Sequence, residues 1–125
     1  MKVAIYGYGN LGKGVECAAY NAADTELVGI FTRRNPKEIV SVSGAPVYSA
    51  EDLPKFKDKI DVVILCGGSA KDLPELTPSL ARDLSVVESF DTHANIPMHI
   101  ENTNAAALSG GKVAVISAGW DPGMF

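Results

Sequence analysis

The chain has 125 residues, with 15 acidic and 11 basic side chains and a formal net charge of −4. This length corresponds to one domain, and 46% apolar with 21% charged residues is ordinary for a soluble globular protein. No apolar run approaches the ~18 residues of a membrane span, and the acidic balance argues against a nucleic-acid partner. The N-terminus lacks a signal peptide's apolar core, and Cys17 and Cys66 lack metal-ligand spacing. We expect a cytoplasmic domain with reduced thiols, no metal site and no membrane partner.

Short β-rich runs alternate with helical patterns along the whole chain. A helix is predicted from about residue 10 to 22, a brief one begins after a Ser49 cap, and one over 96–108 is opened by Pro97. A helical stretch ending near residue 84 contains Pro74 and Pro78, which favour two short pieces over one helix. Residues 35–45 are expected to form a mobile surface loop. The predicted strands are 3–6, 26–31, 46–48, 60–65, 85–87 and 112–116.

Strands that alternate with helices through short connections predict a parallel sheet covered on both faces. Because crossovers between parallel strands are right-handed, the expected arrangement is doubly wound. The fold class is therefore α/β, a Rossmann-type three-layer sheet in a single domain.

A glycine pattern, Gly7-Tyr8-Gly9-Asn10-Leu11-Gly12, follows the first strand directly and opens the first helix. In such a turn the first glycine allows the tight bend and the second lets a pyrophosphate approach bare backbone. The third allows close packing of helix on strand. The helix N-terminus then offers N–H groups and a positive dipole end to phosphates. This context predicts a dinucleotide-binding site.

The end of the second predicted strand indicates which dinucleotide is bound. NAD-binding domains usually carry an acid there for the ribose 2′-hydroxyl, whereas this chain has Thr32-Arg33-Arg34. Two guanidinium groups attract a 2′-phosphate that a carboxylate would repel. NADP is the predicted cofactor; the alternative is that both arginines are ordinary solvated charges.

Ligands of this fold lie across the carboxyl ends of the strands, so the residues after each strand are candidates. Cys66 precedes a small-residue run after the fourth strand that would let backbone approach the cofactor, but for Cys66 itself a small buried side chain is the favoured interpretation. Asp91 and Asp121 follow the fifth and sixth strands, where they would bind a substrate ammonium group or cap helices. His93 is either an acid–base group or a loop histidine, and His99 is expected on the surface.

The runs VAIYGYGNLGKGVE, LVGIFTRR, CGGSAKDLPE, SFDTHANIP and AGWDPGMF, in this order, resemble the N-terminal half of meso-diaminopimelate dehydrogenase. The resemblance covers essentially the whole chain. It implies oxidation by NADP of the D-configured centre of meso-2,6-diaminopimelate to L-2-amino-6-oxopimelate and ammonia, a reversible step of lysine biosynthesis. It also implies a homodimer in the full-length family.

The resemblance implies roles residue by residue. Asp91 and Asp121 would be the catalytic residues and, with Trp120 as a pocket wall, would contact the substrate near its reacting amino group. The cofactor would be held by Gly7, Tyr8, Gly9, Asn10, Leu11 and Gly12 at the pyrophosphate, by Thr32, Arg33 and Arg34 at the 2′-phosphate, and along its further course by Cys66, Gly67, Gly68, Ser69, Ser89, Phe90, Asp91, Ala118, Gly119, Trp120, Asp121 and Pro122.

One departure from the family is large, because its members run about twice this length or more. Residues 1–125 would form the NADP-binding domain, and the family's substrate-binding and dimerisation domain is absent from this chain. We therefore expect cofactor binding with little or no dehydrogenase activity. The rival interpretations are another NADP-linked enzyme, such as dihydrodipicolinate reductase or aspartate dehydrogenase, and a free-standing NADP-binding sensor domain.

Overall fold

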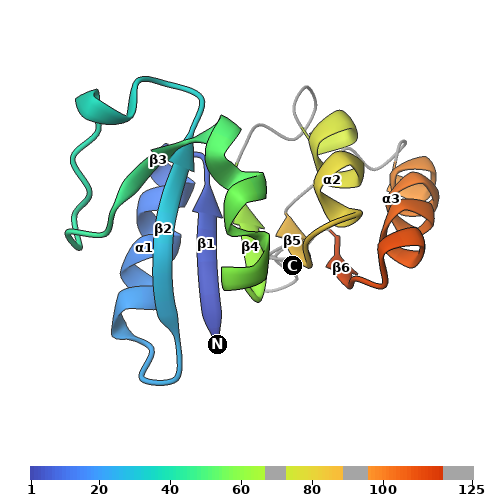
Figure 1. The fold of residues 1–125 in the computed structure, drawn as a ribbon, viewed down its shortest axis with the longest axis horizontal. Coiled ribbons are helices and arrows are strands. Elements are labelled where there is room, and N and C mark those ends of the chain that lie inside the picture. Colours follow the sequence, from blue (N-terminus) through green and yellow to red (C-terminus); the bar gives the residue numbers. More distant parts are fainter. Residues whose placement is uncertain (67–72, 89–95, 117–125) are drawn as a thin grey trace, which may run out of the picture. The chain divides into compact units, whose positions relative to one another are not determined.

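The computed structural model describes residues 1–66, 73–88 and 96–116, and the chain divides into two compact units, residues 1–67 and 68–125. Figure 1 shows strands alternating with helices in chain order. The first unit contains β1 (Lys2–Tyr6), α1 (Asn10–Asn21), β2 (Glu26–Thr32), η1 (Pro36–Glu38), β3 (Val47–Ser49), η2 (Ala50–Lys59) and β4 (Val62–Leu65). The second contains α2 (Leu73–Ala81), β5 (Val86–Glu88), α3 (Ile96–Gly110) and β6 (Ala114–Val115).

The sheet of the first unit is parallel throughout, with the order β3-β2-β1-β4. The chain moves outward from β1 through β2 to β3, then returns to place β4 on the other side of β1. Ile5 of β1 lies between Ile30 of β2 and Ile64 of β4. This reversal at β1 confirms the predicted doubly wound arrangement and creates a switch point at the carboxyl end of β1, where ligands of such sheets bind.

Two neighbouring residues of β2 show that this sheet is covered on both faces. Ile30 packs with Ile5 and Tyr8, and Val15 of α1 joins their cluster. Phe31 instead stacks against Tyr48 and Phe56, with ring centroids 5.3 Å from each. Because consecutive strand side chains point to opposite faces, α1 and η2 cover opposite sides of the sheet. Both Ile30 and Phe31 are fully buried, as the continuous apolar run of this strand predicts.

The second unit pairs β5 with β6 in parallel and packs α2 against α3. α3 lies close to the end of α2 at Gly110, where a Cβ would overlap the carbonyl group of Arg82, the residue that follows α2. α3 ends in a Schellman motif, in which Gly111 (φ +68°) and Lys112 donate their N–H groups to the carbonyls of Leu108 and Ala107. The predicted stop at Gly110-Gly111 is therefore confirmed, two residues beyond the predicted last helical residue.

Two sequence expectations for the second unit are wrong. α2 is one helix with Pro78 inside it, because in a helix that begins at Leu73 this proline removes a single backbone hydrogen bond. His99 is buried rather than on the surface, with 3% of its area exposed. It shares the inward face of α3 with Thr103 and Ala106, at helical spacing. Within the described ranges, no helix combines the length and apolar composition of a membrane span.

Candidate functional site

The turn after β1 is the centre of the candidate site. Gly7 has φ +96°, a left-handed conformation that side chains disfavour, and its N–H group donates to the carbonyl of Phe31 at 2.8 Å. β1 is thus joined to β2 up to the residue where the chain turns into α1. The tight strand-to-helix turn predicted from the glycine pattern is present.

The other two glycines of the pattern differ in what a side chain would meet. At Gly12 a Cβ would overlap the carbonyl oxygen of Gly7 and lie 3.2 Å from its carbon, both of which are backbone atoms. At Gly9 a Cβ would have no atom within 4 Å. Gly12 is therefore required for packing of α1 on the turn, whereas Gly9 leaves open space over the backbone. A bare backbone with open space is what a pyrophosphate needs.

The N-terminus of α1 borders this open space, because Gly9 is the residue before the helix begins. Gly9 is its N-cap residue, so no side chain caps the helix, and its carbonyl accepts from the N–H group of Lys13 at 3.0 Å. The N–H groups of a helix's first turn have no acceptor within the helix. The first turn also carries no acidic side chain, so its positive dipole end is not neutralised locally. Asn10 and Leu11 are exposed at this end.

Arg34 lies against the same turn. Its Nη2 donates to the carbonyl oxygen of Tyr8 at 2.5 Å, and its backbone N–H donates to Oγ1 of the buried Thr32 at 3.0 Å. Arg33 is exposed beside it. The structure thus brings together two segments that the sequence analysis assigned to one cofactor, the glycine-rich turn and the arginine pair after β2.

A buried network below this surface was missed by the sequence analysis. The Tyr8 hydroxyl donates to Glu16 Oε1 at 2.5 Å and accepts from the N–H group of Val42 at 3.1 Å. The other carboxylate oxygen of Glu16 accepts from the N–H group of Ser43 at 2.9 Å and from its hydroxyl. Glu16 is fully buried, on the helix face formed with Gly12 and Ala19. Glu16 lies four residues after Gly12 and so on the same face of the helix, and this spacing was the sequence signal that could have indicated its burial.

The segment 35–45 lies on the surface, as expected, with Val40 85% and Val42 78% exposed. It contains η1 and is hydrogen-bonded to Tyr8 and Glu16 through Val42 and Ser43. Ser41 adds a bond from its hydroxyl to the carbonyl of Ala45 at 2.8 Å. Its polar composition indicated a loop, but the partners that order it lie in α1 and in the glycine-rich turn.

The network shifts the pKa values of both of its ionisable groups. Burial raises the pKa of Glu16, but the hydrogen bonds from Ser43 and Tyr8 outweigh this effect and hold it below its usual value of 4.5. For Tyr8, burial first and the hydrogen bond to Glu16 second raise the pKa of the hydroxyl. At neutral pH the carboxylate is ionised and the phenol is protonated, as donation from Tyr8 to Glu16 requires.

Lowering the pH should therefore reduce the stability of the folded chain through protonation of Glu16. Since its pKa is lower in the folded state than in the unfolded state, the ionised group contributes stability above about pH 5, and this contribution is lost as the pH falls through the folded-state value. We expect Glu16→Gln to lower the melting temperature at pH 7, with the deficit narrowing as the pH falls below the usual glutamate pKa of 4.5. Thermal unfolding by circular dichroism measures this, with Glu51→Gln, an exposed glutamate, as the control. A deficit that is constant over this pH range would contradict the assignment.

Cys66 directly follows β4 and is partly buried against the core. Its N–H group donates to the carbonyl of Tyr6 at 2.8 Å, and its side chain packs against the cluster of Ile5, Tyr8 and Ile30. Burial raises the pKa of its thiol from 9.0 to about 11. The thiol therefore stays protonated at neutral pH and is not a nucleophile.

Thiol labelling should distinguish the two cysteines of the chain. Cys17 is exposed, whereas the raised pKa of Cys66 lowers its thiolate fraction about 100-fold relative to an ordinary cysteine. We expect one thiol to react promptly with a chromogenic disulfide at pH 8 and the second at least about 100-fold more slowly. Cys17→Ser should remove the fast phase only, and unfolding in denaturant should make both thiols react fast. Two fast thiols in the native chain would contradict this assignment.

The remaining predicted site residues lie outside the described residues: Gly67, Gly68, Ser69, Ser89, Phe90, Asp91, His93, Ala118, Gly119, Trp120, Asp121 and Pro122. The assignments of Asp91 and Asp121 as catalytic residues stay predictions. Near them in the sequence, the buried carboxylate of Glu88 lies 3.4 Å from Nε2 of His99. Within residues 1–66, 73–88 and 96–116, no three side chains of the metal-binding types cluster together.

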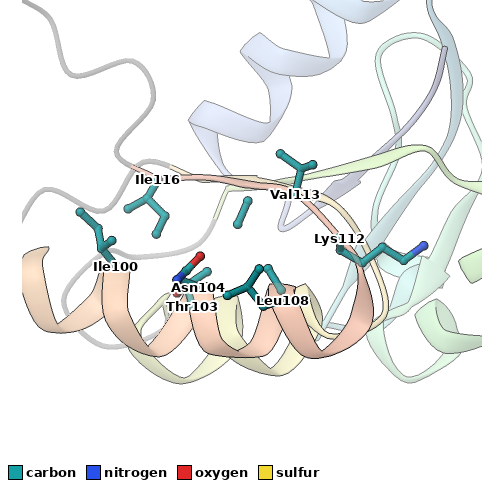
Figure 2. A pocket seen from close by; sticks show the side chains of 9 residues that line it. Ile100, Thr103, Asn104, Leu108, Lys112, Val113 and Ile116 are labelled. Atoms are coloured by element: carbon teal, nitrogen blue, oxygen red, sulfur yellow. The ribbon is translucent and has the colours of Figure 1, made fainter.

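A cavity of about 290 Å³ lies between α3 and the segment around β6. Figure 2 shows Val113 and Ile116 facing Ile100 and Leu108 across it. Among the described residues that line it, Lys112 carries the charged side chain, and the others are Thr103, Asn104, Ala107 and Ala114. The described residues that line it belong to α3 and to residues 112–116 of the second unit.

Comparison with known proteins identifies close relatives of the chain. It is 53% identical over its whole length to a meso-diaminopimelate D-dehydrogenase of Ureibacillus thermosphaericus and 54% identical to that of Lysinibacillus sphaericus. In each case it spans 38% of the relative's length. No protein-family model matches the chain.

Solved structures agree with this result. An engineered D-amino acid dehydrogenase bound to NADP+ matches the whole chain with a TM-score of 0.90 and 45% identity. A C. glutamicum diaminopimelate dehydrogenase in complex with DAP matches 99% of it with a TM-score of 0.88 and 44% identity. The chain covers 38% of each, and these matches support the Rossmann-type α/β fold. The chain is therefore homologous, along its whole length, to the N-terminal part of the meso-diaminopimelate D-dehydrogenases.

Proposed function

We propose that this chain binds NADP(H) as the dinucleotide-binding part of a meso-diaminopimelate D-dehydrogenase. The observation that carries the proposal is the contact between the arginine pair and the glycine-rich turn, in which the Arg34 guanidinium is fixed on the Tyr8 carbonyl beside the open space at Gly9. Phosphate groups would be held by backbone N–H groups at the start of α1 and by this guanidinium. The residues present fit a phosphorylated dinucleotide.

The preference for NADP over NAD follows from charge at the end of β2. Arg34 donates one N–H of Nη2 to the Tyr8 carbonyl. Its guanidinium has four further N–H donors and its side chain is exposed, so it is available to bind a phosphate. The exposed Arg33 adds a second positive charge. A ribose 2′-hydroxyl would gain little from either arginine, whereas each charge-assisted hydrogen bond to a 2′-phosphate contributes about 1.5–3 kcal/mol. A preference of tenfold or more is expected.

The reaction we propose is oxidative deamination at the D-centre of meso-2,6-diaminopimelate. The bound nicotinamide supplies the hydride acceptor. Asp91 and Asp121 would hold the substrate ammonium group and take or relay its proton, since the amine must be neutral when its carbon loses hydride; Trp120 would wall the pocket. These residues lie outside the described part of the chain, so the roles are proposed from the resemblance.

The chain spans 38% of the length of these relatives, so the whole activity is proposed for the full enzyme. By the same resemblance, we propose that the enzyme is a cytoplasmic homodimer in lysine biosynthesis. The family's remaining part would grip the distal end of the substrate. The 125-residue chain alone is then expected to bind cofactor with little or no turnover.

Calorimetric titration of the chain with NADP+ and NAD+ tests the cofactor proposal. We expect NADP+ to bind at least about tenfold more tightly, and an equal or stronger affinity for NAD+ would refute the proposal. A rise in melting temperature when meso-2,6-diaminopimelate is added to the NADP+ complex would favour an enzyme over a nucleotide sensor, because a bound ligand adds stability. Robust NADP+ reduction by the chain alone would refute the need for the remaining part.

A further inference from the structure

The connection between β2 and β3, residues 33–46, is hydrogen-bonded to Tyr8 both at its start and in its second half. At its start, the Arg34 guanidinium donates to the Tyr8 carbonyl oxygen. Near its end, the Val42 N–H group donates to the Tyr8 hydroxyl. Tyr8 lies in the glycine-rich turn with 5% of its area exposed, so this anchor is set in the core rather than on a free surface.

Glu16 fixes that anchor from α1. Its carboxylate accepts from the Tyr8 hydroxyl through one oxygen and from the N–H group and hydroxyl of Ser43 through the other. One buried carboxylate thus joins a helix, the glycine-rich turn and the connection that begins with the arginine pair. An unpaired carboxylate in such a place would be costly, so the structure is stable with Glu16 ionised only while these donors stay in position.

Resting on the proposed function, we infer that Glu16 is a positioning residue for cofactor selection. Through Tyr8 and Ser43 it holds the 33–46 connection against α1, and so keeps the Arg34 guanidinium on the Tyr8 carbonyl, ready for the 2′-phosphate of NADP. The inference concerns the phosphate alone, since the ribose 2′-hydroxyl of NAD does not need a fixed guanidinium. Loss of Glu16 should therefore change the ratio of the two affinities.

Glu16→Gln keeps the size of the side chain. It replaces one carboxylate oxygen, which accepts from Tyr8 or from Ser43, with an amide NH2 group that can only donate. We expect its NADP+ dissociation constant to rise about tenfold and its NAD+ constant to change less than about threefold, measured calorimetrically on the folded chain below its melting temperature. A purely structural role would shift both constants equally. Glu51→Gln, an exposed glutamate of η2, should leave both unchanged.

Two further variants keep the inference testable if Glu16→Gln folds poorly. Ser43→Ala removes the hydroxyl from the carboxylate but retains the backbone N–H group, and should weaken NADP+ binding about threefold with NAD+ unaffected. Tyr8→Phe removes the hydroxyl and retains the carbonyl that receives Arg34, and should act in the same direction. In an Arg34→Ala background, Glu16→Gln should produce no further loss of NADP+ affinity, because the group that it positions is absent.

The outcomes separate this inference from the proposed function. If the unaltered chain prefers NADP+ and the ratio of its NADP+ and NAD+ affinities is the same in the Glu16, Ser43 and Tyr8 variants, Glu16 has no positioning role and the cofactor assignment stands. An additive loss in the Arg34→Ala background would also overturn the inference. If the unaltered chain binds neither nucleotide, or prefers NAD+, both proposals fail.

Discussion

Gly12→Ala is expected to destabilise the first unit severely, whereas Gly9→Ala should fold and lose its dinucleotide affinity. A Cβ at position 12 would overlap the Gly7 carbonyl, a backbone group that cannot rotate away. Overpacking typically costs 1–3 kcal/mol, and a clash with backbone at a tight turn belongs at or above that upper limit. With a typical total stability of about 5–15 kcal/mol, we expect the melting temperature to fall by about 10 °C or more.

The same substitution at Gly9 has the opposite profile. A Cβ there would meet no atom within 4 Å, so the fold should lose less than about 1 kcal/mol. The added methyl group would instead occupy the open space over the backbone and keep the pyrophosphate from the first-turn N–H groups. We expect the NADP+ dissociation constant to rise at least about tenfold.

Gly14→Ala is the matched control for both variants. It lies in the same helix, also has nothing within 4 Å of a Cβ, and should gain about 0.5–1 kcal/mol because alanine is the better helix former. Thermal unfolding and NADP+ titration of the three variants separate packing from binding. A Gly12→Ala chain that melts within 2–3 °C of its parent, or a Gly9→Ala chain with undiminished affinity, would contradict these roles.

The sequence predicts the local parts of this site well, because each rests on a short-range rule. The glycine pattern after β1 defined both the turn and the start of α1, and the apolar run of β2 indicated burial on both faces. The cap at Ser49 and the glycine stop of α3 were read in the same way. In every case the feature is determined by residues within or directly next to it in the sequence.

Long-range pairing accounts for what sequence reasoning missed. Glu16 was not noticed because a glutamate in a helix is usually exposed, and its partner Ser43 is 27 residues away. His99 was placed on the surface because the buried Glu88 that faces it belongs to a different element. In α1 the apolar Leu11 and Ala18 are exposed, whereas Gly12 and Glu16 are buried with Ala19. Helical spacing could have indicated that Glu16 is buried, but the sequence does not show which distant residues a buried polar side chain pairs with.

Removing the arginine pair should change cofactor choice more than any other surface substitution in the chain. Arg33→Ala with Arg34→Ala deletes both positive charges at the end of β2, and Arg34 is the one held on the Tyr8 carbonyl. At about 1.5–3 kcal/mol for each charge-assisted hydrogen bond, the double variant should lose about 100-fold or more in NADP+ affinity. NAD+, which lacks the phosphate, should bind within about threefold of its original affinity.

Two comparisons make this result decisive. Arg82→Ala removes an exposed arginine from the second unit and should leave both affinities unchanged, which excludes a general effect of net charge. Raising the ionic strength should weaken NADP+ binding to the parent chain more than to the double variant, because screening acts on the phosphate–guanidinium pair. An equal loss of NADP+ and NAD+ affinity would instead mean that the arginines support the turn itself. The guanidinium pair would then be a structural element of the β1–α1 junction and not the group that selects the cofactor.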